Sequence, residues 1–331
     1  MTQQYNKRIT GVGSALVDIL INETDDFLNM LDKKKGGMTL VEAADIDHIL
    51  AKTDVPPVVV PGGAACNTII GVGRLGGAAR FIGRRGQDNF GILFEDALRS
   101  ARVEPVLTLS SSPTGSVISV ITPDAQRSMF TYLGASTEMD PARITPDLFT
   151  DTAISIIEGY LLFNPDLLMA SVQSAKKAGS LVALDLASFE VVNACRPILG
   201  DVIREYVDIL IANEDEAAAF TGFTQEEKAI DALSQHVTYA VLKLGKRGSC
   251  VSFDNTVTRI AAKTDRPPKD TTGAGDLWAA GFLFGIANGF SIEKSGALAS
   301  ACGYEVCQVV GAQIPKQKWE KIRSTFSQTP V

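Results

Sequence analysis

The chain has 331 residues, of which 45% are hydrophobic and 21% are charged, so it is long enough and apolar enough to bury a large core. Its formal net charge of -7, from 31 basic and 38 acidic side chains, argues against general binding to nucleic acid or to an anionic membrane. Five scattered cysteines without a CxxC pair indicate a reducing, cytoplasmic setting, and two distant histidines argue against a zinc cluster or a histidine-based triad.

Strand-like and helix-like segments alternate along most of the chain, after a polar N-terminal stretch that has no apolar signal core. No run reaches the roughly 18 apolar residues of a membrane helix. The alternation predicts a mostly parallel sheet with helices on both faces. The predicted strands cover 9–14, 57–60, 78–83, 154–160, 181–186, 207–213 and 238–244. The predicted helices cover 42–51, 64–75, 89–101, 166–178, 213–221, 273–288, 291–306 and 315–326.

Residues 115–134 interrupt this alternation, because two strand-like runs are joined by the turn PDAQ with no helix beside them. Two earlier segments, 18–24 and 38–42, also have the pattern of strands outside the alternating units. We therefore expect one large domain over 1–331 that carries a small additional β-sheet. This sheet would be discontinuous in sequence and would serve as a lid, formed from about 14–24, 36–42 and 115–135.

The stretch KDTTGAGDLWAAGF at 269–282 predicts an unusual helix N-terminus. The apolar spacing places the start of the helix near Gly273, and Gly273, Ala274 and Gly275 leave the first-turn N–H groups without side-chain cover. Unpaired N–H groups and the positive end of the helix dipole together form an anion site. A phosphate group is therefore one ligand that this turn would accept.

Asp276 follows these small residues and is expected to be ionised at neutral pH, because the helix dipole stabilises a carboxylate in the first turn. Such a weak base suits phosphoryl transfer, in which the transition state is loose and the proton of the alcohol is removed late. A helix capped by Asp270, Thr271 or Thr272, with glycines that allow close packing, explains the same residues equally well.

Four motifs occur in order along the chain: PGGAACNTIIGVGRLGG at 61–77 with RFIGRRGQDNFG at 80–91, NEDE at 213–216, LGKRG at 244–248 and DTTGAGD at 270–276. Together they resemble the motifs of the ribokinase-like (PfkB) family of carbohydrate and nucleoside kinases. The resemblance covers nearly the whole chain. It implies a ribokinase-like three-layer α/β/α domain with a mostly parallel central sheet and a small β-sheet lid. It also implies ATP-dependent phosphorylation of a primary hydroxyl group, with Mg²⁺ as a cofactor.

The resemblance also implies roles for individual residues on the nucleotide side. Asp276 would orient and deprotonate the alcohol, the amides of residues 273–275 would hold the transferring phosphoryl group, and Arg127 would assist from the lid. Mg²⁺ would lie near Asn213 and Glu216, which would reach it through water. Considered without the resemblance, Asn213 and Glu216 have the pattern of a capping box, and LGKRG has the pattern of a plain turn. The residues implied to bind the nucleotide are Asn213, Glu216, Lys243, Gly245, Gly248 and Thr272.

On the acceptor side, the resemblance implies that Asp18 accepts hydrogen bonds from two neighbouring hydroxyl groups. The segments 128–136 and 158–163 are more similar to the adenosine-kinase-like branch than to the ribokinase or fructokinase branches. The predicted acceptor is therefore the 5′-hydroxyl of adenosine or a related purine nucleoside. Ser14 departs from the best-studied nucleoside kinases, which carry asparagine there. The residues implied to bind the acceptor are Ser14, Asp18, Gly62, Gly63, Asn67, Leu133 and Tyr160.

Two alternatives stay open. A sugar kinase of the same family, acting on ribose, fructose or a ketodeoxy sugar acid, would carry the same motifs. A non-catalytic sensor of a nucleoside or sugar would keep the binding residues but would not require Asp276. The sequence leaves open the phosphate donor, a requirement for a monovalent cation, and whether the chain is a monomer or a homodimer.

Overall fold

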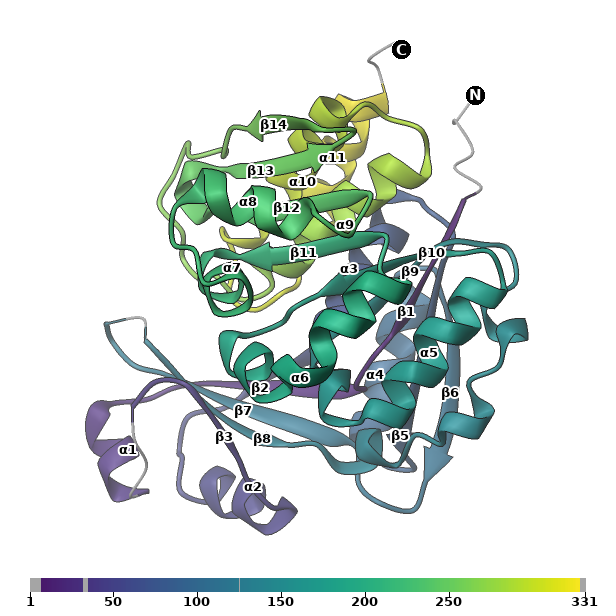
Figure 1. Cartoon of the computed structure of the whole chain (residues 1–331). Coiled ribbons are helices and arrows are strands. Elements are labelled where there is room, and N and C mark those ends of the chain that lie inside the picture. The colour runs from purple at the N-terminus through teal and green to yellow at the C-terminus, as the bar shows by residue number, and fades with distance from the viewer. Residues whose placement is uncertain (1–6, 32–34, 125, 328–331) are drawn as a thin grey trace.

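The computed structural model describes residues 7–31, 35–124 and 126–327, and two β-sheets organise these ranges (Figure 1). The polar N-terminal residues 1–6 and Ala125 of the predicted turn PDAQ lie outside them. Within the described ranges, the larger sheet has nine strands in the spatial order β14 (Thr256–Ile260), β13 (Ser249–Phe253), β12 (Tyr239–Lys243), β11 (Ile209–Asn213), β10 (Leu181–Asp185), β9 (Thr152–Glu158), β1 (Arg8–Val12), β5 (Ala79–Gly86) and β6 (Val103–Ser110).

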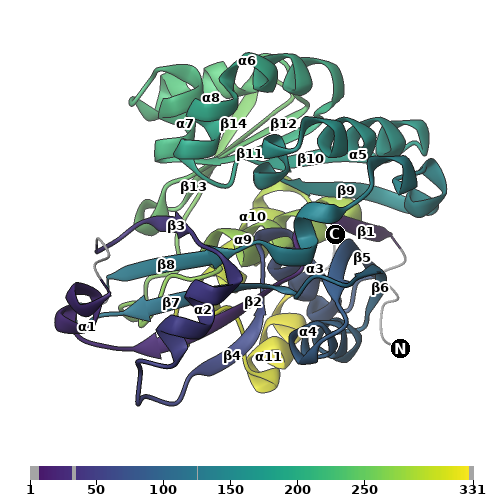
Figure 2. The same cartoon turned by 90° about the horizontal axis from the view of Figure 1, so that it is seen from below.

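Strands β12 to β6 of this order are parallel, and only β13 and β14 at one edge are antiparallel. Helices cover both faces of the sheet (Figures 1 and 2). One layer contains α5 (Pro165–Lys177), α6 (Phe189–Tyr206), α7 (Glu214–Thr221) and α8 (Glu226–Ser234). The other layer contains α3 (Ala64–Leu75), α4 (Asn89–Ser100), α9 (Ala274–Ala287), α10 (Ile292–Val306) and α11 (Lys316–Ser327).

The side chains of the central strands explain the two helical layers. In β10, Val182 and Leu184 are fully buried in one apolar cluster, and Ala183 between them is fully buried in the other. Successive side chains of a strand point to opposite faces, so a continuous apolar run requires cover on both sides. The predicted three-layer arrangement with a mostly parallel sheet is confirmed. Across the described residues, no helix is long and apolar enough to cross a membrane.

The smaller sheet projects from one side of the larger one (Figure 1). It contains, among the described residues, five strands in the order β3 (Met38–Leu40), β8 (Arg127–Tyr132), β7 (Gly115–Ile121), β2 (Leu16–Asn22) and β4 (Val58–Gly62). The short helices α1 (Asp25–Met30) and α2 (Ala43–Leu50) lie beside it. Strands β7 and β8 form the predicted antiparallel hairpin. The prediction for 57–60 is wrong in one respect, because this segment pairs antiparallel with β2 as an edge of the smaller sheet, a place that tolerates Pro61.

The sequence pattern does not predict β6, the β13–β14 hairpin, or helices α1, α6 and α8. Strand β6 contains Pro105, which is tolerated because β6 is an edge strand. Helix α6 continues through Pro197, a residue that normally ends a helix. Asp254 and Asn255 join β13 to β14 with positive φ angles of 48° and 57°, as in a tight hairpin turn. Short 3₁₀ helices complete the fold: η1 (Gly134–Glu138), η2 (Pro141–Arg143), η3 (Pro146–Phe149), η4 (Gly159–Phe163) and η5 (Gly245–Arg247).

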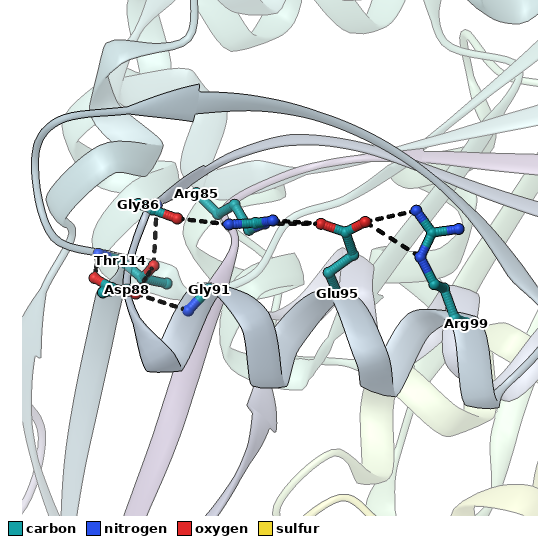
Figure 3. Close-up of polar contacts among 7 residues, drawn as sticks. All are labelled: Arg85, Gly86, Asp88, Gly91, Glu95, Arg99 and Thr114. Carbon is teal, nitrogen blue, oxygen red and sulfur yellow. Dashed lines mark hydrogen bonds and ion pairs between the residues drawn. The ribbon is translucent and has the colours of Figure 1, made fainter.

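The RFIGRRGQDNFG segment forms a joint between the two sheets (Figure 3). Asp88 caps α4 by accepting the N–H of Gly91 at 2.8 Å. The same carboxylate accepts the N–H and the hydroxyl of Thr114, both at 2.6 Å. Thr114 directly precedes β7, so Asp88 connects the larger sheet to the first strand of the hairpin. Arg85 and Glu95 extend the network along α4 through an ion pair at 2.6 Å.

Replacing Asp88 with alanine should destabilise the protein by about 2 kcal/mol, because the helix loses its cap and Thr114 loses two charge-assisted hydrogen bonds. Urea unfolding followed by circular dichroism measures this loss. Asp88→Asn is the matched control. It should lose only about half as much stability as the alanine variant, since asparagine is also a good N-cap. Equal stability of the alanine variant and the wild type would show that the joint is not held by this carboxylate.

Candidate active site

The first turn of α9 is formed by small residues, as the sequence predicts. Gly273, which precedes the helix, has a φ of 71°, and a Cβ there would lie 2.7 Å from the Cβ of Ala312. Both its backbone conformation and its packing therefore require glycine. No side chain of the described residues caps the helix, so its first N–H groups have no side-chain cover. Ala274 and Gly275 line a cavity of about 320 Å³ onto which this turn opens.

Asp276 is held against α3 by two hydrogen bonds. The side-chain amide of Asn67 donates to Asp276 Oδ2 at 2.9 Å, and the hydroxyl of Thr68 donates to the Asp276 carbonyl oxygen at 3.1 Å. Asn67 thus directs its N–H group to the carboxylate. Its Oδ1 is buried without a hydrogen-bond partner among the described residues. A buried unpaired acceptor is costly, so this oxygen is suited to accept a hydroxyl proton of a ligand.

The pKa of Asp276 is raised to about 7, mainly because burial disfavours the charged carboxylate. The hydrogen bond from Asn67 lowers this pKa and Asp185 raises it, while Lys243 lowers it and Glu158 raises it. The expectation that Asp276 is fully ionised at neutral pH is therefore wrong. It relied on the helix dipole alone and could not include desolvation or the neighbouring acids. A carboxylate with a pKa near 7 is a better base than the sequence suggests.

Lys243 and Asp185 form an ion pair at the carboxyl edge of the larger sheet. Lys243 ends β12 and Asp185 ends β10, and the Lys243 Nζ lies 3.0 Å from Asp185 Oδ2. Burial alone would lower the pKa of Lys243, but the carboxylates of Asp185 and Glu216 outweigh it, and the pKa lies above its ordinary value. The lysine therefore carries its charge. Asp185 is not identified by the sequence pattern, because no motif surrounds it.

Asn213 and Glu216 form a reciprocal capping box at the start of α7. The Asn213 side chain accepts the N–H of Glu216 at 2.9 Å, and Glu216 Oε2 accepts the N–H of Asn213 at 2.7 Å. Glu216 Oε1 accepts the side-chain amide of Asn213 at 2.7 Å, so both carboxylate oxygens are engaged. Burial raises the pKa of Glu216 to about 7. Among the described residues, no group of three His, Cys, Asp or Glu side chains is arranged to hold a metal ion directly.

The cavity beside α9 is lined by basic side chains. Its walls contain Lys243, Lys246, Lys263 and Arg266 and, among the described residues, no acidic side chain. This contrasts with the net charge of -7 for the whole chain. Of the residues implied to bind the nucleotide, Gly245 and Gly248 also line it, together with the aromatic rings of Trp278 and Tyr304. The cavity therefore suits a ligand with an aromatic part and several negative charges.

The predicted acceptor residues near the start of the smaller sheet lie side by side. A Cβ on Gly62 would lie 2.5 Å from Asp18 Oδ1. Gly63 has a φ of 92°, and a Cβ on it would lie 2.7 Å from the Ser14 carbonyl oxygen. Glu158 at the end of β9 is buried and accepts the N–H of Ser14 at 2.7 Å. Glu158 therefore holds the loop that connects the two sheets, a role that the sequence pattern does not reveal.

The predicted acceptor residues lie close to Asp276. The thiol of Cys66, in the first turn of α3, is fully buried, and burial together with the carboxylates of Glu158, Asp18 and Asp276 raises its pKa. Glu158 accepts the N–H of Ala65, Asp276 accepts the amide of Asn67, and Asp18 lies against Gly62 just before α3, so the three acids lie around the N-terminus of α3. The structure thus brings Asp18 and Asp276 to the same region from residues more than 250 positions apart in sequence.

Arg127 connects the smaller sheet to the loop that precedes α9. It starts β8 and forms a largely buried ion pair with Asp270. Asp270 also accepts the N–H and hydroxyl of Thr272, both at 2.9 Å, and the N–H of Gly311 at 2.7 Å. The pKa of Asp18 is raised to about 6 by burial, lowered by Arg127 and raised by Asp270. Asp270 therefore orders this loop and pairs with the arginine, instead of capping the helix.

Two further predicted residues lie at the margin of this region. Tyr160 belongs to η4, and its pKa is raised to about 12 by burial and by the carboxylates of Glu158 and Asp276. Leu133 follows β8 directly and precedes η1. A role in ligand binding stays a prediction for both.

The chain is similar to known proteins along most of its length. A family model described as pfkB family carbohydrate kinase matches residues 17–319. Adenosine kinase of Saccharomyces cerevisiae is 27% identical over 330 residues, which cover 93% of this chain and 96% of the yeast protein. A probable sugar kinase from Rhizobium etli CFN 42 has a TM-score of 0.89 at 28% identity, covering 97% of this chain and 99% of that one. Adenosine kinase from Sinorhizobium meliloti has a TM-score of 0.88 at 30% identity, covering 97% of this chain and 99% of that one.

Proposed function

The chain belongs to the pfkB family of carbohydrate kinases, and on this premise we propose that it transfers the γ-phosphoryl group of ATP to the 5′-hydroxyl of adenosine or a related purine nucleoside. One observation supports phosphoryl transfer above all others. The uncapped N-terminus of α9 opens, beside Asp276, onto a cavity whose walls are basic and, in the described part of the chain, free of acidic side chains. The triphosphate of ATP fits such a cavity through its negative charge, and the adenine ring fits the aromatic walls.

In this proposal, Asp276 accepts the proton of the acceptor hydroxyl, since it directly follows Gly275 of the cavity wall and its carboxylate has a pKa of about 7. The amides at Gly273, Ala274 and Gly275 stabilise the charge on the transferring phosphoryl oxygens. Lys243 adds a positive charge at the same turn, and Arg127 approaches from the smaller sheet. The smaller sheet acts as a lid on a single kinase domain, and its closure would exclude water that competes with the alcohol.

Mg²⁺ fits this site as an ion that arrives with the nucleotide. Glu216 and Asn213 offer oxygen atoms that are already engaged in the capping box, so they suit an ion that keeps most of its own water shell. When bound, Mg²⁺ would neutralise charge on the phosphate groups. The five cysteines are unpaired, which supports the cytoplasmic location expected from the sequence.

The nucleoside acceptor is supported by the likeness to adenosine kinases along almost the whole chain. A sugar kinase is the second candidate, supported by the similar structure described as a probable sugar kinase. Asp18 serves either acceptor, because one carboxylate can accept hydrogen bonds from two neighbouring hydroxyl groups of a ribose or of a free sugar. The purine ring, which only the nucleoside carries, would then distinguish the two classes of substrate.

The direct test is a substrate panel with purified protein, ATP and Mg²⁺, in which ADP release is followed. The panel contains adenosine, inosine, guanosine, cytidine, ribose, fructose and 2-keto-3-deoxygluconate. The expected result is a kcat/KM for adenosine or another purine nucleoside at least 100-fold above that for every sugar. Turnover with sugars alone would replace the nucleoside assignment by the sugar kinase, and binding without any turnover would favour a sensor.

The pH dependence of kcat/KM should show an acidic limb near pH 7. The pKa of Asp276 is raised to about 7 by burial, so the carboxylate is lost to protonation as the pH falls below this value. Activity should therefore fall towards tenfold per pH unit between about pH 7 and 6, and more steeply, towards 100-fold per unit, below pH 6, where Asp18, with a pKa of about 6, is protonated as well. Initial rates between pH 5 and 9 at low acceptor concentration measure this profile. A flat profile between pH 5.5 and 8 would contradict the role of Asp276 as a base.

A further inference from the structure

The ion pair between Asp185 and Lys243 crosses a strand. In the larger sheet β11 lies between β10 and β12, so the two side chains meet over the carboxyl end of β11. The side chains of Lys243 and Asp185 are only 14% and 11% exposed. A buried pair of this kind costs desolvation energy and is a poor way to gain stability. Its position at the carboxyl edge, where ligands bind in open parallel sheets, suggests a functional reason.

Asp185 is held rigidly. Its Oδ1 accepts the N–H of Ala187 at 3.3 Å, and its Oδ2 accepts the ammonium of Lys243 at 3.0 Å. Ala187 has a φ of 65°, a left-handed conformation that non-glycine residues rarely adopt. The short side chain and the tight turn after β10 therefore fix the carboxylate, and the carboxylate in turn fixes the end of the long lysine.

The Lys243 ammonium is held against the first turn of α9. A Cβ on Gly275 would lie 3.0 Å from Lys243 Nζ, so the ammonium lies directly beside the backbone of Gly275. Both residues line the basic cavity. A positive charge at a helix N-terminus is unfavourable, because the helix dipole is positive at that end. Without an anion to hold it, the lysine would turn away from this place.

We propose that Asp185 is a positioning residue for phosphoryl transfer, which holds the Lys243 ammonium at the N-terminus of α9 where the transferring phosphoryl group of the nucleotide lies. The inference rests on the proposed kinase function and adds to it a residue that acts through Lys243. A bound phosphoryl group resolves the unfavourable arrangement, because its negative charge lies between the ammonium and the positive helix end. Asp185 thereby keeps the lysine in place in the free enzyme, before the nucleotide arrives.

The same charges act on the base. Four side chains act on the pKa of Asp276: Asn67 of α3, Glu158 at the end of β9, Asp185 and Lys243. Asp276 in turn raises the pKa values of Cys66 and Tyr160. Asp185 raises the pKa of Asp276, whereas Lys243 lowers it. Removing one charge or the other should therefore move the acidic limb of the pH profile in opposite directions.

The test compares Asp185→Asn, Lys243→Met and the double variant with the wild type. Asp185→Asn should lower kcat about 10- to 100-fold and leave the KM of the acceptor within about threefold. The acidic limb of kcat/KM should move to lower pH in Asp185→Asn and to higher pH in Lys243→Met. The double variant should be no slower than Lys243→Met alone, because Asp185 acts through the lysine. Asp185→Glu, which keeps the charge, should recover part of the lost kcat.

Asp208→Asn is the matched control. Asp208 pairs with Lys176 at 2.9 Å, but it precedes β11 at the opposite edge of the sheet, so its loss should leave kcat and the pH profile unchanged in folded protein. Circular dichroism and gel filtration confirm folding of each variant. If Asp185→Asn does not fold, the shift of the acidic limb to higher pH in Lys243→Met and a kcat of Asp185→Glu above that of Lys243→Met still test the proposal.

Two results would overturn the inference while leaving the kinase assignment intact. One is a wild-type kinase whose Asp185→Asn variant keeps kcat within twofold with an unmoved acidic limb. The other is a double variant whose loss of kcat equals the product of the two single losses, since that would make the residues independent. A wild type that transfers phosphate to no acceptor of the panel is a different outcome, because it would overturn the proposed function itself.

Discussion

Asp276→Asn should lower kcat by about 10³-fold or more, while the KM values of ATP and of the acceptor change by less than about threefold. Asparagine has nearly the shape of aspartate and preserves a hydrogen bond with Asn67, but it cannot accept the proton of the alcohol. The loss should therefore appear in the chemical step and not in binding. Single-turnover kinetics with saturating acceptor measure that step directly, and binding of both substrates by calorimetry checks that the site is intact.

The same substitution should raise the stability of the protein at pH 8. A folded-state pKa above the unfolded value means that the contribution of Asp276 to stability is greatest below about pH 4 and is lost as the pH rises towards 7. Above pH 7 the wild type must bury a charge that asparagine does not carry. The melting temperature of Asp276→Asn should therefore exceed that of the wild type at pH 8, and the difference should shrink at pH 5.

Asp231→Asn is the control, because Asp231 is an exposed acid on α8. It should change neither kcat nor the melting temperature. A loss of kcat smaller than about tenfold in Asp276→Asn would remove the base from the proposed mechanism. A variant that is inactive and also less stable at pH 8 would indicate damage to the fold and not the loss of a proton acceptor.

Asp18→Ala should raise the KM of the acceptor at least 100-fold. Two charge-assisted hydrogen bonds to neighbouring hydroxyl groups contribute about 1.5–3 kcal/mol each, and tenfold in affinity corresponds to about 1.4 kcal/mol. The KM of ATP should change little, because Asp18 belongs to β2 and does not line the basic cavity. Initial-rate kinetics with each substrate varied in turn separate the two effects.

Deoxy analogues of the acceptor make this test specific for Asp18. In the wild type, an analogue that lacks a hydroxyl group bound by Asp18 should have a higher KM than the parent compound. The increase should match the part of the Asp18→Ala effect that this one contact contributes. In Asp18→Ala, the analogue and the parent compound should have the same KM. Asp26→Ala, an exposed acid on α1 beside the same sheet, is the control and should leave every KM unchanged. An equal penalty for the analogue in both enzymes would move the hydroxyl contacts to another residue.

The sequence predicts the small-residue turn at the start of α9 well because its signal is local. Gly273, Gly275 and Asp276 are neighbours in the chain, and the first turn of a helix has the same geometry wherever it occurs. The alternation of strands and helices likewise predicts the three layers, since buried parallel strands and amphipathic helices have distinct periods. The NEDE motif is also local, and the capping box that it predicts is present.

Asp185 and Glu158 escape prediction because their roles depend on strand order. Each ends a strand, and only the order of β9, β10, β11 and β12 in the sheet brings these carboxylates to Asp276 and Lys243. The sequence also does not predict the raised pKa of Asp276, because this pKa depends on burial and on acids that lie far away in sequence. The pairing of Arg127 with Asp270 similarly joins segments that no local pattern connects.

The pairing of Asn67 with Asp276 has a consequence for protein synthesis. The two residues are 209 positions apart, and the helix with Asp276 follows both sheets in the chain. At about 5–20 residues per second, a ribosome would need roughly 10–40 s to proceed from one residue to the other. A chain that ends before residue 276 would therefore contain Asp18 and Asn67 but lack Asp276, the carboxylate that accepts the amide of Asn67.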